Sequence, residues 1–166
     1  MVDVAKLNRM SVVEARAAFN RCCDCQRWVE GMIARRPFES PDALFAAAAA
    51  EFQKLKQPDW LEAFAGHPKI GDMQSLKQKY GATSDLCSAE QAGAVGADEE
   101  VLQALAECNR AYETKFGHIF IVCASGKSAA EMLSILQSRL NNDASTELSI
   151  AAQEQAKITR LRLEKL

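Results

Sequence analysis

The chain has 166 residues, of which 48% are hydrophobic and 25% charged, a balance typical of globular proteins that bury a core. Its formal net charge of −2 provides no general attraction to nucleic acids or anionic membranes. No apolar run approaches the roughly 20 residues of a membrane-spanning helix. The first residues also lack the basic and then apolar pattern of a signal peptide, so we expect a cytoplasmic protein that binds neither nucleic acid nor membrane.

Strong helix signals run through the first half of the chain. Ser11 and Glu14 form a capping-box pattern, and Ser40 followed by Pro41 is typical of an N-cap with proline at the first helical position. Apolar side chains recur at helical spacing between these starts and the prolines or glycines that follow. The patterns predict helices over about 11–21, 25–35, 41–55, 58–65 and 72–80.

The second half of the chain is also helical in pattern, apart from one segment. Helices are predicted from Ser88, over 98–116 and 128–140, and from 145 to the end. The segment His118–Ala124 is instead a continuous apolar run between Gly117 and Gly126, too short for a helix and without a strand partner. We therefore expect one all-α domain over 1–166, a helical bundle with a short buried extended segment near residues 118–124.

An extended segment inside a helical bundle leaves its backbone N–H and C=O groups without a neighbouring strand. A polar ligand is one partner that would satisfy these groups. Alternatively, the segment is a short strand or connector whose backbone groups bond side chains and water. The residues alone leave both interpretations open.

The six cysteines are Cys22, Cys23, Cys25, Cys87, Cys108 and Cys123. Three of them cluster over 22–25, which suggests a metal site, but no second Cys or His pair lies at zinc-like spacing. Disulfides are rare in proteins without an export signal. We therefore expect free, half-buried thiols and no bound metal.

His67 lies between two predicted helices, in the hexapeptide His67–Asp72. The resting pKa of histidine is the nearest to neutral pH of any side chain, which suits a general acid or base. Pro68 favours an extended backbone at His67, and Gly66 can end the preceding helix. The alternative is a capping or surface histidine, which the spacing alone does not exclude.

Glu90 and Arg162 also have two interpretations each. In the first turn of a helix, Glu90 complements the helix dipole while Gln91 completes a capping box. Alternatively, Glu90 accepts a proton from a neighbouring histidine or substrate hydroxyl, or it orients that histidine or hydroxyl. Arg162 lies among other basic residues, where it belongs to a solvated face or holds a carboxylate or amide oxygen through its guanidinium.

Taken together, these segments resemble the family of 2-oxo-4-hydroxy-4-carboxy-5-ureidoimidazoline (OHCU) decarboxylases, which act in urate catabolism. The segments that carry the resemblance follow the family's order along nearly the whole chain. They are Arg36-Pro37-Phe38, His67-Pro68-Lys69-Ile70-Gly71, Glu90-Gln91-Ala92-Gly93, Tyr112 to Gly117 leading into Phe120-Ile121-Val122-Cys123-Ala124, and Lys157-Ile158 before Arg162-Leu163. The resemblance implies an all-α fold, a homodimer, a small-molecule substrate and no cofactor.

For the site, the resemblance implies that His67 is the catalytic acid/base and that Glu90 lies beside it. It places substrate contacts at Pro68, Cys87, Ser88, Gln91, Phe120, Ile121, Val122, Cys123, Ala124 and Arg162. Cys87 stands where the family often has a serine and Ser88 follows it, so either of these two side chains can supply that contact. His118 stands where the family commonly has an apolar residue, and it offers either a polar contact or cover for a surface.

The activity that this resemblance implies is decarboxylation of OHCU to (S)-allantoin. The OHCU ring carries an imine beside the carbon that loses CO₂, so the substrate itself takes up the electron pair. Two other functions remain open: a non-catalytic helical interaction module, and a hydrolase that opens a related purine-derived heterocycle. The hydrolase would need an activated water, and the sequence offers no metal ligands to activate one.

Overall fold

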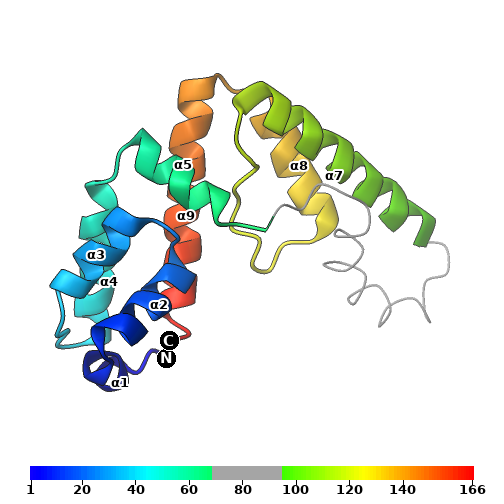
Figure 1. Ribbon diagram of the computed structural model, residues 1–166. Coiled ribbons are helices and arrows are strands. Elements are labelled where there is room, and N and C mark those ends of the chain that lie inside the picture. The colour runs from blue at the N-terminus through cyan, green and yellow to red at the C-terminus, as the bar shows by residue number, and fades with distance from the viewer. Residues whose placement is uncertain (69–94) are drawn as a thin grey trace. The chain divides into compact units, whose positions relative to one another are not determined.

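The computed structural model describes residues 1–68 and 95–166, and all regular secondary structure in these two ranges is helical (Figure 1). The helices are α1 (Val4–Arg9), α2 (Val12–Cys22), α3 (Gln26–Ala34), α4 (Pro41–Gln53), α5 (Gln57–Ala65), α7 (Val95–Phe116), α8 (Ala129–Arg139) and α9 (Ala144–Leu163). The all-α prediction is confirmed. The helices predicted over 72–80 and from Ser88 lie outside the described residues. No helix within the described ranges has the length and apolar character needed to cross a membrane.

Side-chain caps begin three of these helices where the sequence predicts them. At α2, Glu14 N donates to Ser11 Oγ at 3.2 Å and Ser11 N donates to Glu14 Oε2 at 2.8 Å, which is the reciprocal capping box. Ser40 and Ser128 cap α4 and α8, each through one hydrogen bond from a backbone N–H three residues later. These bonds satisfy N–H groups that have no partner inside the helix.

Two helix starts differ from the sequence interpretation. The short helix α1 was not predicted, although Asp3 caps it by accepting a hydrogen bond from Lys6 N at 2.9 Å. The helix α7 begins at Val95 rather than at Asp98. Glycine costs a helix only about 1 kcal/mol relative to alanine, so the glycine at position 96 does not prevent a start at Val95.

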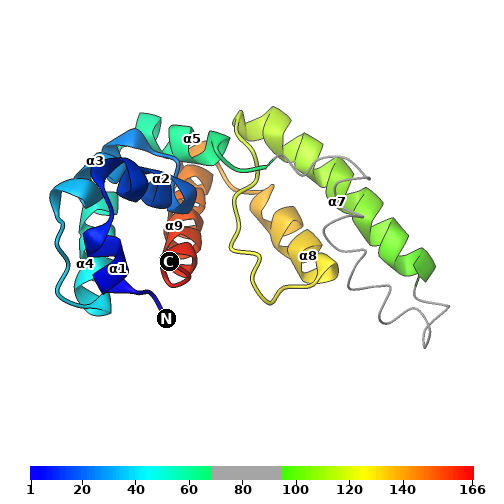
Figure 2. The same ribbon diagram turned by 60° about the horizontal axis from the view of Figure 1, so that its bottom comes forward.

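The described residues divide into two compact units, which are considered separately. Unit 1 comprises residues 1–67, 121–123 and 150–166. In it α2 packs against α3 and α3 against α4, and the two ends of the chain lie side by side (Figures 1 and 2). Phe19 and Trp28 are fully buried in an edge-to-face pair with ring centroids 6.0 Å apart, and Trp28 Nε1 donates to Ala48 O at 3.1 Å. Leu163 brings α9 into the same core.

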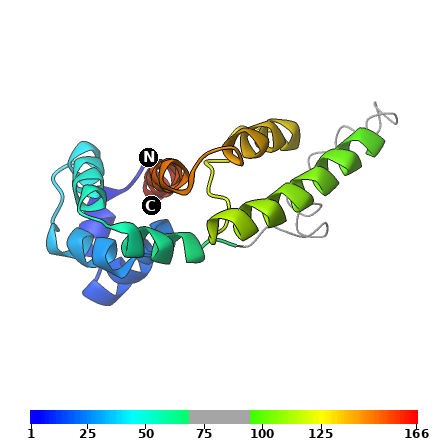
Figure 3. The same cartoon turned by 90° about the horizontal axis from the view of Figure 1, so that it is seen from above.

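Unit 2 comprises residues 68–120 and 124–149. Its described part is dominated by α7 and α8, which pack against each other (Figure 3). The buried side chains between them come mainly from two stripes at helical spacing. They are Leu102, Leu105, Ala106 and Tyr112 on α7, and Met132 and Leu136 on α8.

The segment Arg36-Pro37-Phe38 has a structural role in unit 1. Asn8 Nδ2 donates to Phe38 O at 2.8 Å, and Phe38 N donates to Asn8 Oδ1 at 2.9 Å. Arg36 Nη2 donates to Met10 O at 2.5 Å, just beyond the end of α1. These bonds tie the turn after α3 to α1, which explains this part of the sequence pattern without a ligand.

The chain between α7 and α8 is neither helix nor strand over residues 119–124, as predicted. Gly117 has φ +77°, in the left-handed region that favours glycine, and its N–H donates to Glu113 O at 2.9 Å to end α7. Ile121 and Val122 are buried, whereas the other five residues of 118–124 are half-buried. The prediction that the segment 118–124 is buried is therefore confirmed fully only for Ile121 and Val122.

Candidate functional site

His67 follows α5 directly, and its backbone ends that helix. Gly66 N donates to Ala63 O at 3.3 Å, and His67 N donates to Phe64 O at 3.2 Å. A β-carbon at Gly66 would lie 2.5 Å from Asp24 Cβ, so any residue other than glycine before His67 would require Asp24 or the backbone to shift. The imidazole is half-buried rather than a free surface group, and this burial favours the functional interpretation of His67 over a purely solvated one.

The His67 ring is held by a residue that the sequence interpretation did not identify. His67 Nε2 lies 2.5 Å from Oε1 of Gln155, a fully buried side chain on α9. Gln155 Nε2 donates to Thr159 Oγ1 at 3.2 Å. The sequence does contain a signal for this pair. Gln155 and Thr159 lie four residues apart on the stripe of α9 that also holds the buried Ala151 and Leu163. Polar groups on the buried face of a helix need specific partners.

Arg162 lies on the same side of α9, three residues beyond Thr159. Its Nη1 atom is 3.3 Å from Arg21 O and 3.5 Å from Cys22 O, at the end of α2. The residue is half-buried, so only part of its side chain is in solvent. A cation at the carbonyl end of a helix complements the helix dipole. Arg162 therefore has a structural role at α2, and an experiment has to distinguish this role from substrate binding.

The cysteine cluster in unit 1 is made of buried, neutral thiols. Within the described residues no cysteine forms a disulfide, and Cys22, Cys23 and Cys25 are fully buried rather than half-buried as expected. Burial raises the pKa of Cys22 to about 11 and that of Cys23 to about 12, and the opposing charge of Arg162 is too weak to reverse this. Such thiols are poor nucleophiles at neutral pH.

Cys25 lies in a group with Asp59 and Glu62, whose potential ligand atoms are all within 4.8 Å of one another. The carboxylates serve as helix caps: Asp59 Oδ2 accepts from Lys56 N at 2.9 Å, and Glu62 Oε1 accepts from Gln26 N at 3.0 Å. Burial and then the two negative charges raise the pKa of Cys25. Helix capping accounts for this group without a metal.

A groove of about 330 Å³ lies between α4 and α9 in unit 1. Small alanine side chains on α4 leave the space, and Phe45, Phe52 and Arg160 are among the residues that line it. The guanidinium of Arg160 stacks on the Phe45 ring at 3.4 Å and bonds Glu164 at 2.8 Å. None of the predicted site residues lines this groove.

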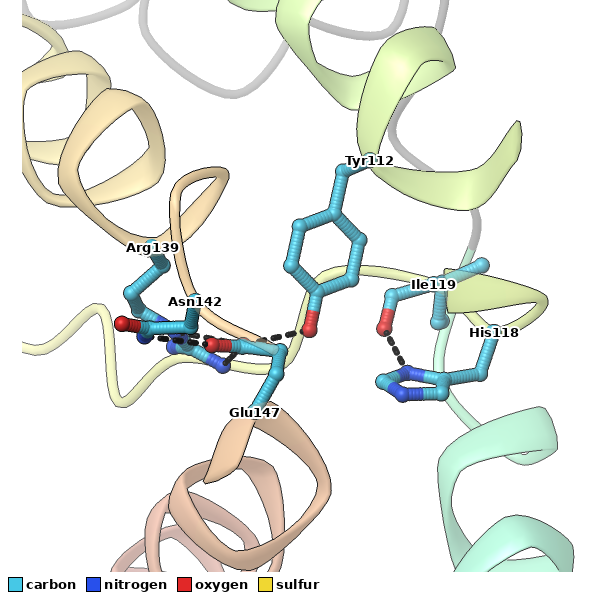
Figure 4. Close-up of polar contacts among 6 residues, drawn as sticks. All are labelled: Tyr112, His118, Ile119, Arg139, Asn142 and Glu147. Carbon is cyan, nitrogen blue, oxygen red and sulfur yellow. Dashed lines mark hydrogen bonds and ion pairs between the residues drawn. The ribbon is translucent and has the colours of Figure 1, made fainter. Parts of the chain in front are cut away.

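Aromatic rings surround the start of the segment 118–124 in unit 2. Phe120 packs edge-to-face on Tyr112 with ring centroids 5.3 Å apart, and the Arg139 guanidinium lies 4.6 Å from the Phe120 centroid. His118 also packs edge-to-face on Tyr112, at 5.6 Å, and its Nδ1 donates to Ile119 O at 3.0 Å (Figure 4). The geometry shows His118 packed against its own segment.

A buried polar cluster fixes these rings (Figure 4). Glu147 is completely buried, and its Oε1 accepts from Tyr112 OH at 2.5 Å and from Arg139 Nε at 2.7 Å, while Oε2 accepts from Asn142 at 3.1 Å. Burial raises the pKa of Glu147, but the hydrogen bonds from Arg139, Tyr112 and Asn142 outweigh it and hold the pKa below its usual value. The sequence interpretation missed this cluster, which joins α7, α8 and the first turn of α9.

The structure therefore describes part of the predicted site. His67 contacts Gln155, Phe120 contacts Tyr112 and Arg139, and Arg162 contacts the end of α2. Pro68 is exposed, Ile121 and Val122 are buried, and Cys123 and Ala124 are half-buried. Four predicted site residues lie outside the described residues, so the expected proximity of Glu90 to His67 stays a prediction. They are Cys87, Ser88, Glu90 and Gln91.

Comparisons with known proteins identify relatives along the whole chain. A family model described as OHCU decarboxylase matches residues 8–164. The uric acid degradation bifunctional protein TTL of Arabidopsis thaliana is 40% identical over 145 residues, which are 87% of this chain and 45% of that protein. The chain thus spans less than half of that relative.

Two further relatives match over most of their own length. The 2-oxo-4-hydroxy-4-carboxy-5-ureidoimidazoline decarboxylase of Amia calva is 26% identical over 166 residues, covering 98% of this chain and 93% of that protein. A crystal structure of OHCU decarboxylase in the presence of (S)-allantoin is 38% identical and superposes with a TM-score of 0.70, covering 89% of this chain and 94% of that one.

Replacing Glu147 by Gln tests how strongly its cluster stabilises unit 2. The change removes the charge of Glu147 from its ion pair with the buried Arg139, and loss of one partner from a buried ion pair costs about 3–5 kcal/mol. We expect the free energy of unfolding in urea at neutral pH to fall by about 3 kcal/mol. The matched control is Glu164→Gln, which removes the exposed partner of Arg160 and should cost less than about 1 kcal/mol.

The same variant has an expected pH dependence. Because the folded-state pKa of Glu147 lies below the usual 4.5, its stabilising contribution is complete above that pH and is lost as the pH falls through the lowered folded-state value. The wild-type chain should therefore lose stability more steeply on acidification than Glu147→Gln. Identical acid dependence of the two proteins would contradict an ionised, paired Glu147.

Proposed function

Because the chain belongs to the OHCU decarboxylase family, we propose that it converts 2-oxo-4-hydroxy-4-carboxy-5-ureidoimidazoline into (S)-allantoin and CO₂. The observation that carries this proposal is the family match over residues 8–164, a range that includes His67 and Arg162. The relative that is 38% identical was crystallised in the presence of (S)-allantoin, which supports the same product for this chain.

The reaction asks the protein to position a ring and to move protons. When the bond to the carboxylate breaks, its electron pair moves into the ring toward the neighbouring imine nitrogen, and CO₂ leaves. Solvent supplies the proton that neutralises this nitrogen. The ring hydroxyl then gives up its proton and becomes a carbonyl, while the adjacent carbon gains a proton on one face, which yields (S)-allantoin.

In this proposal His67 takes the hydroxyl proton and delivers it to the adjacent carbon, and Glu90 orients the hydroxyl. The half-buried position of His67 and its bond to a buried amide support the role, because a positioned acid/base transfers a proton more efficiently than a mobile one. Arg162 holds an oxygen of the substrate. Residues 120–124 supply apolar cover and backbone groups for the ring and ureido amides.

A coupled assay tests the proposed activity. Urate oxidase and the hydrolase that acts before this step generate OHCU in the cuvette, and its decay is followed with and without the chain. Accelerated decay with formation of (S)-allantoin, identified by chiral chromatography, is the expected result. Unchanged decay to racemic allantoin, or a ring-opened acid as the product, would contradict the proposal.

Replacing His67 by Asn tests its role in that assay. Removal of a general acid/base lowers kcat by about 10²- to 10⁴-fold, and we expect a loss in this range with an unchanged circular dichroism spectrum. The matched control is His118→Asn, which removes the other histidine and should lower kcat by less than about threefold. A His67 variant that keeps nearly the wild-type rate would show that another group moves the proton.

Replacing Arg162 by Ala separates substrate binding from helix capping. A hydrogen bond to a charged group is worth about 1.5–3 kcal/mol, so loss of a substrate contact should weaken (S)-allantoin binding at least about tenfold in calorimetry. Arg160→Ala is the control on the same helix and should leave this affinity unchanged. If Arg162→Ala lowers only the melting temperature, Arg162 caps α2 and does not bind substrate.

A homodimer and a cytoplasmic location belong to the same proposal. The thiols of Cys22, Cys23, Cys25 and Cys108 support a reducing compartment, where thiols persist. Light scattering of the purified chain should give about twice the 18.2 kDa of one copy. A mass of one copy at micromolar concentration would contradict the dimer.

A further inference from the structure

Gln155 bonds two partners through the two ends of its amide. Its Oε1 lies 2.5 Å from His67 Nε2, and its Nε2 lies 3.2 Å from Thr159 Oγ1. Gln155 is completely buried and Thr159 is 3% exposed, so both side chains are almost entirely removed from bulk solvent. The amide therefore has a fixed environment on both sides.

Thr159 decides which end of the amide faces His67. The Thr159 hydroxyl donates its proton to Gln155 O at 2.9 Å, one turn back along α9. With its proton in that bond, Oγ1 presents a lone pair to the amide of Gln155. Only the NH₂ end of Gln155 can bond that lone pair, and its carbonyl end therefore faces the imidazole.

A carbonyl oxygen accepts hydrogen bonds and never donates them. His67 Nε2 must therefore carry a proton, and in the neutral ring the lone pair then lies on Nδ1. We propose that Gln155 is a positioning residue that fixes His67 as the Nε2–H tautomer and thereby makes Nδ1 the atom that exchanges protons with the substrate. The part concerning the substrate rests on the proposed decarboxylation, whereas the tautomer does not depend on it.

The tautomer is measured directly by NMR of the chain labelled with ¹⁵N-histidine. The chain contains two histidines, so the His118→Gln variant assigns the ring signals. In the wild-type chain with the ring neutral, the expected spectrum has a protonated Nε2 with a slowly exchanging proton and an unprotonated Nδ1. A ring protonated on Nδ1 instead would overturn the proposal.

Gln155→Met removes the acceptor while keeping a side chain of similar length. We expect the slowly exchanging Nε2–H signal to disappear and kcat for OHCU to fall about tenfold or more, with the affinity for (S)-allantoin changed less than about twofold. Retention of both the Nε2–H signal and the wild-type kcat would overturn the positioning role. A melting curve establishes that the variant is folded.

Substitution of Thr159 provides a second test, which leaves Gln155 itself unchanged. Thr159→Val is nearly isosteric and removes the oxygen that orients the amide, so it should weaken the Nε2–H signal and lower kcat. Thr159→Ser keeps the hydroxyl and should restore both. Equal spectra and rates for the Val and Ser variants would contradict the orienting role of Thr159 and with it the argument for the tautomer.

The two proposals fail in different ways. If the wild-type chain does not accelerate OHCU decay, the decarboxylase proposal is wrong, and the ring spectrum of the wild type and Gln155→Met still decides whether Gln155 holds Nε2–H. If the chain is active but Nδ1 carries the proton, the activity stands and the role assigned to Gln155 is wrong.

Discussion

The hydrogen bond between His67 Nε2 and Gln155 Oε1 connects the end of α5 to α9, across 88 positions of the chain. A histidine that follows a helix is ordinarily free to turn into solvent, and both tautomers of its neutral ring are then populated. Here a buried amide removes that freedom, and the orientation of the amide is itself fixed by Thr159. The chemical character of His67 is thus determined by residues that never need to touch a substrate.

Both units use a buried polar side chain to hold other groups, but the electrostatics differ. In unit 2 the negative charge of Glu147 is balanced by Arg139 and supported by two neutral donors, so the cluster is rigid and ionised. In unit 1 Gln155 and Thr159 carry no charge. Because Gln155 is a neutral amide, its bond to His67 adds no charge of its own beside the ring.

The sequence predicts the helices well because their ends are marked locally. Ser11, Ser40 and Ser128 cap helices as their patterns indicate, and the apolar run at 118–124 is indeed non-helical. His67 was identified by its residue type and by the break after α5. Gln155 and Glu147 were missed because helical periodicity tells which face a residue is on, but not which distant residue it meets there.

Titration of (S)-allantoin into the ¹⁵N-histidine-labelled chain, followed by ring NMR, tests the central claim most directly. If His67 meets the ligand through Nδ1 while Gln155 keeps Nε2–H, the Nδ1 signal of His67 should move on saturation and the Nε2–H signal should persist. If neither ring signal of His67 moves while calorimetry shows the ligand bound, His67 does not lie at the site and the account is wrong.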